Sequence, residues 1–319
     1  MDGLLYLVGL GLVKVLQALP LRWVARLGRA GGALAYALDA RHRRVARRNL
    51  AMCLGRERTP AEIHALAREN FRRLGESYCC AVKTAAMTWP ELRGAVEFAG
   101  VEKAPLDGPD KPPRSTVVAI GHFGNFELYA RFGEFMPLFR CATTYRGLRQ
   151  ASLNRLMQGL REASSGCAYF ERRTDSAALK AWMAPSGKML GLLADQHAGT
   201  GGIRVPFFGH DCSTTASPAV FALRYGCVLH TAICYRVGLA RWRIELGDEI
   251  PTRDGGKARS VAAITQEINL AFEQAVRRDP ANWFWVHNRW KPEKPKAPRL
   301  ESNTPSSQPA SHGLKSSPP

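Results

Sequence analysis

The chain has 319 residues, 45% of them hydrophobic, which is enough to bury one large core. Lys and Arg total 45 against 27 Asp and Glu, and the net charge of +18 suits nucleic acid, an acidic membrane surface or an acidic protein. No recognised nucleic-acid-binding motif is present, so we expect no nucleic-acid partner. The eight Cys residues show no zinc-ligand spacing, and we expect reduced, buried thiols in the cytoplasm and no metal site.

The first 30 residues form a candidate membrane segment. Residues 4–21 are apolar and about as long as a membrane span, but Lys14 and Gln17 interrupt them. Basic residues follow, above all in the run 41–48, which would lie against anionic headgroups if it is not simply a solvated helix face. A spanning anchor, which would place the rest of the chain in the cytoplasm, and an amphipathic helix in the interface both fit, and a buried core helix is a third possibility.

Residues 115–127 show the pattern of a strand, a tight loop and a helix. The β-branched run 116–120 predicts a buried strand, Gly121 and Gly124 mark a tight loop, and a helix is expected from residue 126 with Asn125 as its N-cap. His122 then lies at the carboxyl end of a strand, where α/β sheets bind ligands, and Glu127 lies in the first helical turn. Such a carboxylate would orient the imidazole, although a packed His and a helix-terminal Glu would have the same spacing.

Other elements follow at regular intervals. Thr59-Pro-Ala-Glu62 is a capping box that begins a helix, and residues 260–278 show a second helical face. Strands are expected near residues 142–145, 189–194, 227–235 and 242–246. The strand 189–194 ends in Asp195-Gln196, and Asp195 either orients His122 or an arginine, or caps a turn. Phe207 and Phe208 are expected in the core rather than in a groove.

Three separated blocks resemble one enzyme family. His122-Phe-Gly-Asn-Phe-Glu127 resembles the signature of the bacterial lipid A biosynthesis acyltransferases, within the wider glycerolipid acyltransferases that share His-x4-Glu. The segment 195–209 and the Trp-Val-His-Asn-Arg-Trp string at 285–290 match the same family, as do Tyr145-Arg146 and Arg161. Gly147 departs from the family pattern, which usually has Pro there, as do Asn154-Arg155, where Asn-Pro is usual, and Asn288, where Arg is commoner.

The resemblance, over roughly residues 40–291, implies an α/β fold with a mixed central sheet flanked by helices and an N-terminal membrane-associated helix. The expected organisation is a membrane anchor or interfacial helix in residues 1–30, an acyltransferase domain in 31–291 and a disordered Pro/Ser-rich tail in 292–319. His122 and Glu127 would be catalytic. Substrate-contacting side chains are expected to be Arg146, Arg161, Asp195, Gln196 and Arg289, the last together with His287 at the cleft.

The implied reaction moves an acyl group from an acyl carrier protein thioester to a hydroxyl of an anionic lipid A precursor, at the cytoplasmic face of the inner membrane. His122 would remove the hydroxyl proton, Glu127 would fix its tautomer, and the helix N-terminus after Gly124 with a nearby Arg would hold the oxyanion. The absence of a Gly-x-Ser-x-Gly elbow agrees with direct transfer, and no cofactor beyond the thioester co-substrate is needed.

Three alternatives remain open from the sequence. The same machinery would serve another glycolipid or a lysophospholipid as acceptor. A thioesterase would pass the acyl group to water instead. A non-catalytic basic protein would only bind membranes. The oligomeric state is not indicated.

Overall fold

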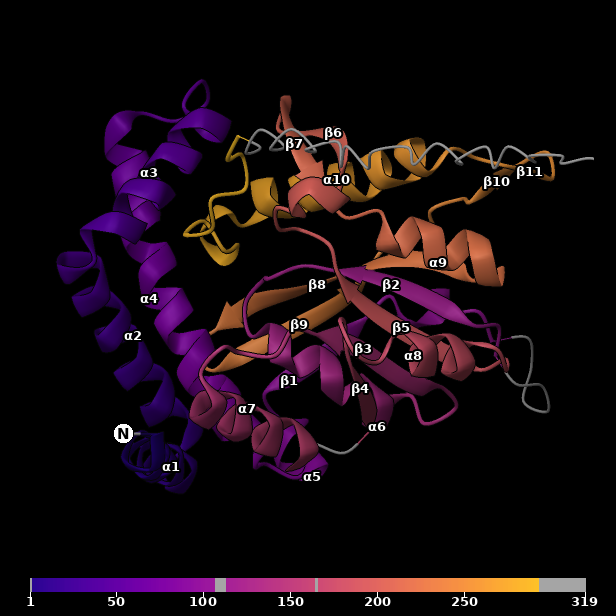
Figure 1. Ribbon diagram of the computed structural model, residues 1–319. Coiled ribbons are helices and arrows are strands. Elements are labelled where there is room, and N and C mark those ends of the chain that lie inside the picture. Colours follow the sequence, from indigo (N-terminus) through magenta and orange to yellow (C-terminus); the bar gives the residue numbers. More distant parts are fainter. Residues whose placement is uncertain (1, 107–112, 164–165, 293–319) are drawn as a thin grey trace, which may run out of the picture.

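A seven-stranded sheet with helices on both faces forms the centre of the molecule (Figure 1). The computed structural model describes residues 2–106, 113–163 and 166–292, so the expected tail lies outside the described residues except for its first residue. The strand order is β1-β9-β8-β2-β5-β3-β4, and all neighbours are parallel except β8 and β9. The expected mixed α/β sheet flanked by helices is confirmed. Its strands are β1 (Val96–Ala99), β2 (Thr116–Ile120), β3 (Arg140–Tyr145), β4 (Cys167–Glu171), β5 (Lys188–Leu193), β8 (Val228–Gly238) and β9 (Arg241–Leu246).

Strand β2 lies in the middle of the sheet, between β5 and β8, and all five of its residues are buried. Both of its faces are covered, as its continuous β-branched sequence predicts. Val117 and Ala119 face one core, which the helices α8 (Ser176–Met183), α9 (Ser217–Tyr225) and α10 (Val261–Arg278) complete. Val118 and Ile120 face the other core.

Four helices at the N-terminal end form a layer along one side of the sheet, shown in indigo and purple in Figure 1. Helix α4 begins at the expected capping box, in which Glu62 N donates to Thr59 Oγ1 and Thr59 N donates to Glu62 Oε2. Helix α2 lies very close to α4, because a Cβ on Gly28 would come 2.5 Å from the carbonyl oxygen of Gly75. The four are α1 (Asp2–Ala18), α2 (Leu21–Leu38), α3 (Ala40–Leu54) and α4 (Pro60–Ala85).

The N-terminal segment is not one long helix. It breaks before Pro20, whose ring has no N–H to donate and clashes with the preceding turn, and α2 starts at Leu21 and continues past residue 30. Within the described ranges, no helix has both the length and the hydropathy that crossing a bilayer requires. The structure therefore gives no support to the expected spanning anchor. Large apolar side chains on α1 are nevertheless exposed: Leu4, Leu7, Val8, Leu12 and Val15.

The helix expected from residue 126 is shorter and tighter than predicted. It is a 3₁₀-helix, η2 (Phe126–Arg131), followed by the one-turn helix α6 (Phe132–Phe135). Asn125 precedes it but does not cap it with its side chain, which donates instead to Thr84 Oγ1 on α4.

The other elements are α5 (Trp89–Leu92), α7 (Ala151–Ala163), the 3₁₀-helices η1 (Val101–Lys103), η3 (Gly199–Gly201) and η4 (Pro280–Asn282), and the strand pairs β6 (Ile203–Phe207) with β7 (His210–Thr214) and β10 (Arg253–Asp254) with β11 (Lys257–Ala258).

Candidate active site

The loop that carries His122 is held in place by the C-terminal segment. Gly124 N donates to the carbonyl oxygen of Asn282 over 3.0 Å, and Phe123 forms a β-bridge with Trp283. Gly124 has a φ of 51°, and a Cβ there would lie 2.6 Å from the carbonyl oxygen of Cys234. Only glycine fits this position without strain. The Gly124 amide is thus used to tie this loop to the C-terminal segment.

His122 forms a hydrogen-bonded pair with Asp195, which follows the neighbouring strand β5. Nδ1 of His122 lies 2.8 Å from Oδ1 of Asp195, and the backbone amide of His122 donates to Oδ2 over 2.8 Å. Trp283 Nε1 also donates to Oδ2, over 2.9 Å. This carboxylate is fully surrounded, with 1% of its side chain exposed.

The charge on Asp195 decides which nitrogen of His122 carries the proton. Burial raises the pKa of Asp195, but the charge of His122 and the hydrogen bonds from His122 and Trp283 outweigh burial, so its pKa is lowered overall. An ionised carboxylate only accepts hydrogen bonds, so Nδ1 of a neutral His122 carries the hydrogen. The lone pair is therefore on Nε2, the atom that a general base needs.

Two phenylalanines enclose the His122 ring. Phe126 meets it edge-on at 4.7 Å between ring centroids, and Phe284 stacks on it at 5.6 Å. The ring is 14% exposed, so the imidazole is confined but still reachable. Phe284 and Trp283 were not predicted at the site, although the Trp-Phe-Trp run at 283–285 was an available signal.

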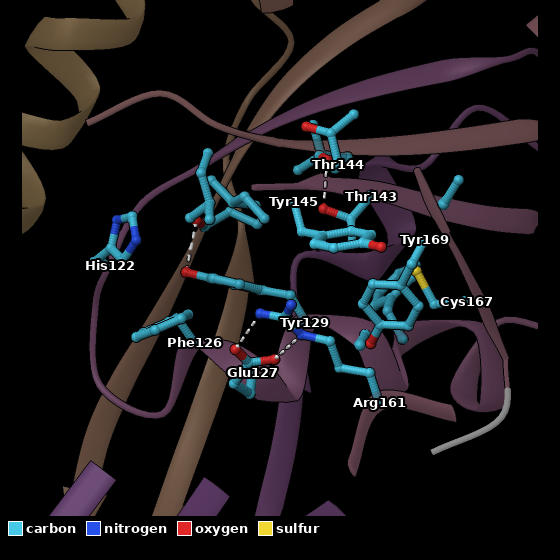
Figure 2. Close-up of a pocket in the computed structure, with 18 of the residues that line it drawn as sticks. His122, Phe126, Glu127, Tyr129, Thr143, Thr144, Tyr145, Arg161, Cys167 and Tyr169 are labelled. Carbon is cyan, nitrogen blue, oxygen red and sulfur yellow. Dashed lines mark hydrogen bonds and ion pairs between the residues drawn. The ribbon is translucent and has the colours of Figure 1, made fainter. Parts of the chain in front are cut away.

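Glu127 does not orient His122 as expected. Its carboxylate pairs with Arg161 on α7, with Oε1 2.9 Å from Nη2 and Oε2 3.4 Å from Nε. The guanidinium also lies over the rings of Tyr145 and Tyr169, at 5.5 and 5.7 Å (Figure 2). The tautomer of His122 is therefore fixed by Asp195 and not by Glu127. Glu127 lies in the 3₁₀-helix η2, and its partner is on α7.

A cavity of about 570 Å³ brings these groups together (Figure 2). His122, Glu127, Arg161, Arg146 and Gln196 all line it, as the sequence predicted of residues at a common site. Its apolar lining comes largely from one face of the sheet: Val118, Ile120, Met189, Leu193, Ala232, Ile244 and Leu246.

Arg289 does not lie at the cleft, where the sequence placed it. Its side chain is completely buried and donates to the carbonyl oxygens of Gln196 and Ser213, over 2.9 and 2.5 Å, and to Thr214 Oγ1 over 2.7 Å. These hydrogen bonds hold the loop after β5 in place, and the Arg289 side chain does not line the cavity. His287 likewise accepts from the backbone amide of His197 over 3.2 Å instead of reaching the cavity.

Burial tests the expectations for Phe207 and for the Cys residues. Phe207 is 1% exposed and packs on Trp283 and Trp290, so the choice of core over groove is confirmed. All eight Cys residues are unpaired, but only Cys80, Cys212, Cys227 and Cys234 are buried. Among the described residues, no cluster of three or more His, Cys, Asp or Glu is arranged to hold a metal ion.

Comparison with known proteins identifies the chain at the level of the family. Residues 3–292 match the family model of the bacterial lipid A biosynthesis acyltransferases. The chain belongs to this family. The lipid A biosynthesis palmitoleoyltransferase of Escherichia coli K12 is 26% identical over 294 residues, which cover 89% of this chain and 90% of that one. The phosphatidylinositol mannoside acyltransferase of Mycolicibacterium smegmatis is 25% identical over 261 residues, covering 76% and 78%.

The acyltransferase is thus similar both to an enzyme named for lipid A and to one named for a mannosylated phosphoinositide. What the family assignment adds to the geometry is the class of reaction, acyl transfer.

Proposed function

We propose that the protein transfers a fatty acyl group from a thioester donor to a hydroxyl of a lipid A precursor, with His122 as the general base. The observation that carries the proposal is the His122–Asp195 pair at one wall of a largely apolar cavity. A base with a free Nε2 lone pair meets the need of a hydroxyl, which is a weak nucleophile until its proton is removed.

The proposed reaction is a direct attack of the acceptor on the thioester, with no covalent enzyme intermediate. His122 Nε2 takes the acceptor hydroxyl proton as the oxygen attacks the thioester carbonyl, and Asp195 stabilises the imidazolium that forms. The tetrahedral intermediate then collapses, the carbon–sulfur bond breaks, and the proton passes from the imidazolium to the leaving thiolate. The products are the new ester and a free thiol, so the thioester is the only co-substrate required and no cofactor enters.

The cavity suits a hydrocarbon chain. Gly191 on β5 contributes no side chain to the lining, and the cavity continues over the sheet face between Val118 and Ile244. Burying apolar chain surface here would stabilise the bound donor by about 25 cal/mol per Å² of area removed from water.

Arginines on the polar lining fit the anionic parts of the substrates. Arg146, Arg161 and Arg172 all line the cavity, and a guanidinium binds phosphate oxygens with two parallel hydrogen bonds. We assign Arg146 and Arg161 to substrate phosphate and Gln196 to the same polar wall. Acyl carrier protein, which is acidic, is the proposed donor, because a net charge of +18 would steer it to the enzyme.

We place the enzyme at the cytoplasmic face of the inner membrane, bound through α1 and α2. Leu7 and Leu12 on α1 are 64% and 61% exposed, and exposed apolar side chains beside basic ones are typical of helices that lie in a membrane interface. The acceptor lipid would then reach the cavity from the bilayer.

The test is an acyl-transfer assay with purified enzyme, radiolabelled acyl carrier thioester and a panel of acceptors. Labelled lipid A precursor, lost in His122→Ala, is the expected result. Transfer only to a phosphoinositide mannoside or a lysophospholipid would move the proposal to that acceptor, an outcome that the mycobacterial relative's name favours. Release of free fatty acid without any acylated acceptor would show that the protein is a thioesterase. If no donor is consumed with any acceptor, the protein would be a non-catalytic membrane-binding protein.

A further inference from the structure

A second cavity, of about 490 Å³, lies between α2, α3 and α4. Its basic lining, which we call the arginine cradle, consists of Arg43, Arg47, Arg68 and Arg72. None of these residues lines the cavity that contains His122. The rest of the lining is Ala33, Tyr36, Ala37 and His64.

The sequence spacing of the helices builds the cradle. Arg43 and Arg47 are four residues apart on α3, and Arg68 and Arg72 are four residues apart on α4, so each pair shares one helix face. The two faces border the same space, and Ala33 and Ala37 of α2 leave room at its base. Arginine side chains from two helices thus border one groove.

One member of the cradle is held in a fixed orientation. Arg43 Nη1 donates to the carbonyl oxygens of Tyr36 and Ala37, over 2.5 and 2.7 Å, and its guanidinium lies 5.6 Å from the Tyr36 ring centroid. The Tyr36 hydroxyl in turn lies 3.2 Å from Nε2 of His64. A guanidinium has five N–H donors, so Arg43 keeps donors beyond the two bonds of Nη1.

The cradle differs from two other arginines of the same helices. Arg29 on α2 and Arg73 on α4 share the carboxylate of Glu69, and Arg73 also pairs with Asp279. In the part of the chain that the structure describes, by contrast, no carboxylate forms an ion pair with Arg47, Arg68 or Arg72. Like charges four residues apart on a helix destabilise it, so an anion would offset a cost that the fold leaves uncompensated.

We propose that the arginine cradle binds the phosphate of an anionic phospholipid headgroup. The argument for a lipid over a soluble anion is the surface beside the cradle. Helix α2, whose Ala33 and Ala37 line the groove, carries an exposed apolar stripe at helical spacing, and its members are Trp23, Leu27, Leu34 and Leu38. A lipid likewise places its phosphate next to its hydrocarbon, so stripe and cradle match the two parts of one molecule.

The test compares two triple variants of the full chain. In the first, Arg47, Arg68 and Arg72 are each changed to Gln. The second changes Arg173, Arg224 and Arg253, which are exposed and lie outside the cradle, and so has the same net charge. Co-sedimentation is measured with phosphatidylcholine vesicles that do or do not contain phosphatidylglycerol. We expect the cradle variant to bind the anionic vesicles about a hundredfold more weakly, from about 1 kcal/mol per basic residue, and the control to bind within about twofold of the parent.

A second measurement separates a built site from general attraction. Short-chain phosphatidylglycerol and inorganic phosphate are titrated against the thermal melt of both variants, and we expect the lipid to stabilise the parent and the control but not the cradle variant. Equal losses of vesicle binding in the two variants would overturn the site in favour of diffuse charge. Stabilisation by phosphate but not by the lipid would show that the cradle binds a soluble anion, against the proposal. Binding of acyl carrier protein is measured as well. If the cradle variant loses that binding and still binds the vesicles, the cradle is a protein-binding site and the proposal is wrong.

The site does not depend on the acyl-transfer proposal. Transfer to detergent-dispersed acceptor should be unchanged in the cradle variant, because the groove is separate from the His122 cavity. A cradle variant that keeps this activity but leaves the vesicles would support the inference whatever the acceptor is.

Discussion

Oδ1 of Asp195 lies 2.8 Å from Nδ1 of His122, although the two residues are 73 positions apart. They meet because β2 and β5 are parallel neighbours that end at the same edge of the sheet, where Ala194 N donates to the carbonyl oxygen of Ile120 over 2.9 Å. The pair is therefore a product of strand order. Glu127, five residues from His122 in the sequence, is used to hold Arg161 instead.

Asp195→Asn should lower turnover by about a hundredfold or more. The amide oxygen would have to stay where it accepts from the backbone N–H of His122 and the indole N–H of Trp283. Its NH₂ would then face Nδ1 and force the ring hydrogen onto Nε2. His122 would then have no lone pair at the cavity, which is the loss of a general base. Initial rates of acyl transfer check this, with His122→Ala as the reference for complete loss. Activity near the parent level in Asp195→Asn would refute the assigned tautomer.

Glu127 and Arg161 should behave as one unit. Glu127→Gln leaves Arg161 without its carboxylate, and Arg161→Gln leaves Glu127 without its cation, so each single change should lower kcat/KM by about tenfold or more. The double variant should lose little beyond either single one. A double-mutant cycle on kcat/KM measures this coupling, and strictly additive losses would show that the two side chains act separately.

Gly191→Leu should shorten the acyl chain that the enzyme accepts. A Cβ at Gly191 has ordinary contacts, the nearest being Ile120 Cδ1 at 3.4 Å, so the larger side chain would extend into the cavity space over the sheet. We expect kcat/KM for long-chain donors to fall by about tenfold while short chains are retained. Gly94→Leu is the matched control, because nothing lies within 4 Å of a Cβ there. An unchanged chain-length profile in Gly191→Leu would place the acyl chain elsewhere.

His287 should make the fold less stable in mild acid. Burial lowers its pKa from 6.5 to about 4, since a charged ring would lose solvation and its Nε2 could no longer accept from His197 N. Between these two pH values the unfolded chain binds more protons than the folded one, so the free energy of unfolding is full above 6.5 and falls as pH drops toward 4, by about 3 kcal/mol at most.

His287→Gln removes this titration and keeps an acceptor for His197. Urea unfolding of parent and variant at about pH 7.5 and about pH 4.5 measures the effect. The difference in unfolding free energy between the two conditions should be smaller in the variant. Equal pH dependence would mean that His287 titrates alike in the folded and unfolded chain.

The sequence predicted best what depends on neighbours along the chain. The strand at residues 116–120, the capping box at Thr59 and the helix that follows Ser260 all lie where local patterns placed them. The sequence also identified the members of the cavity wall, Arg146, Arg161 and Gln196, through their place in the family pattern.

Partners that meet across the fold were harder to predict. The sequence alone allows Asp195 to orient His122, to orient an arginine or to cap a turn, because nothing local tells which strand lies beside β2. The family resemblance predicts Arg289 at the cleft, but the side chain is buried, because three oxygen acceptors for it come from residues 196, 213 and 214.

The hydrogen bond from Trp283 to Asp195 sets when the site can form during synthesis on the ribosome. The segment that steadies the carboxylate and pins the loop at Phe123 is among the last of the domain to be translated. A nascent chain that has folded its sheet but not yet released residues 282–285 would carry a misaligned imidazole. The site is therefore complete only after residues 282–285 have been made, and stop codons just before this segment should yield inactive protein.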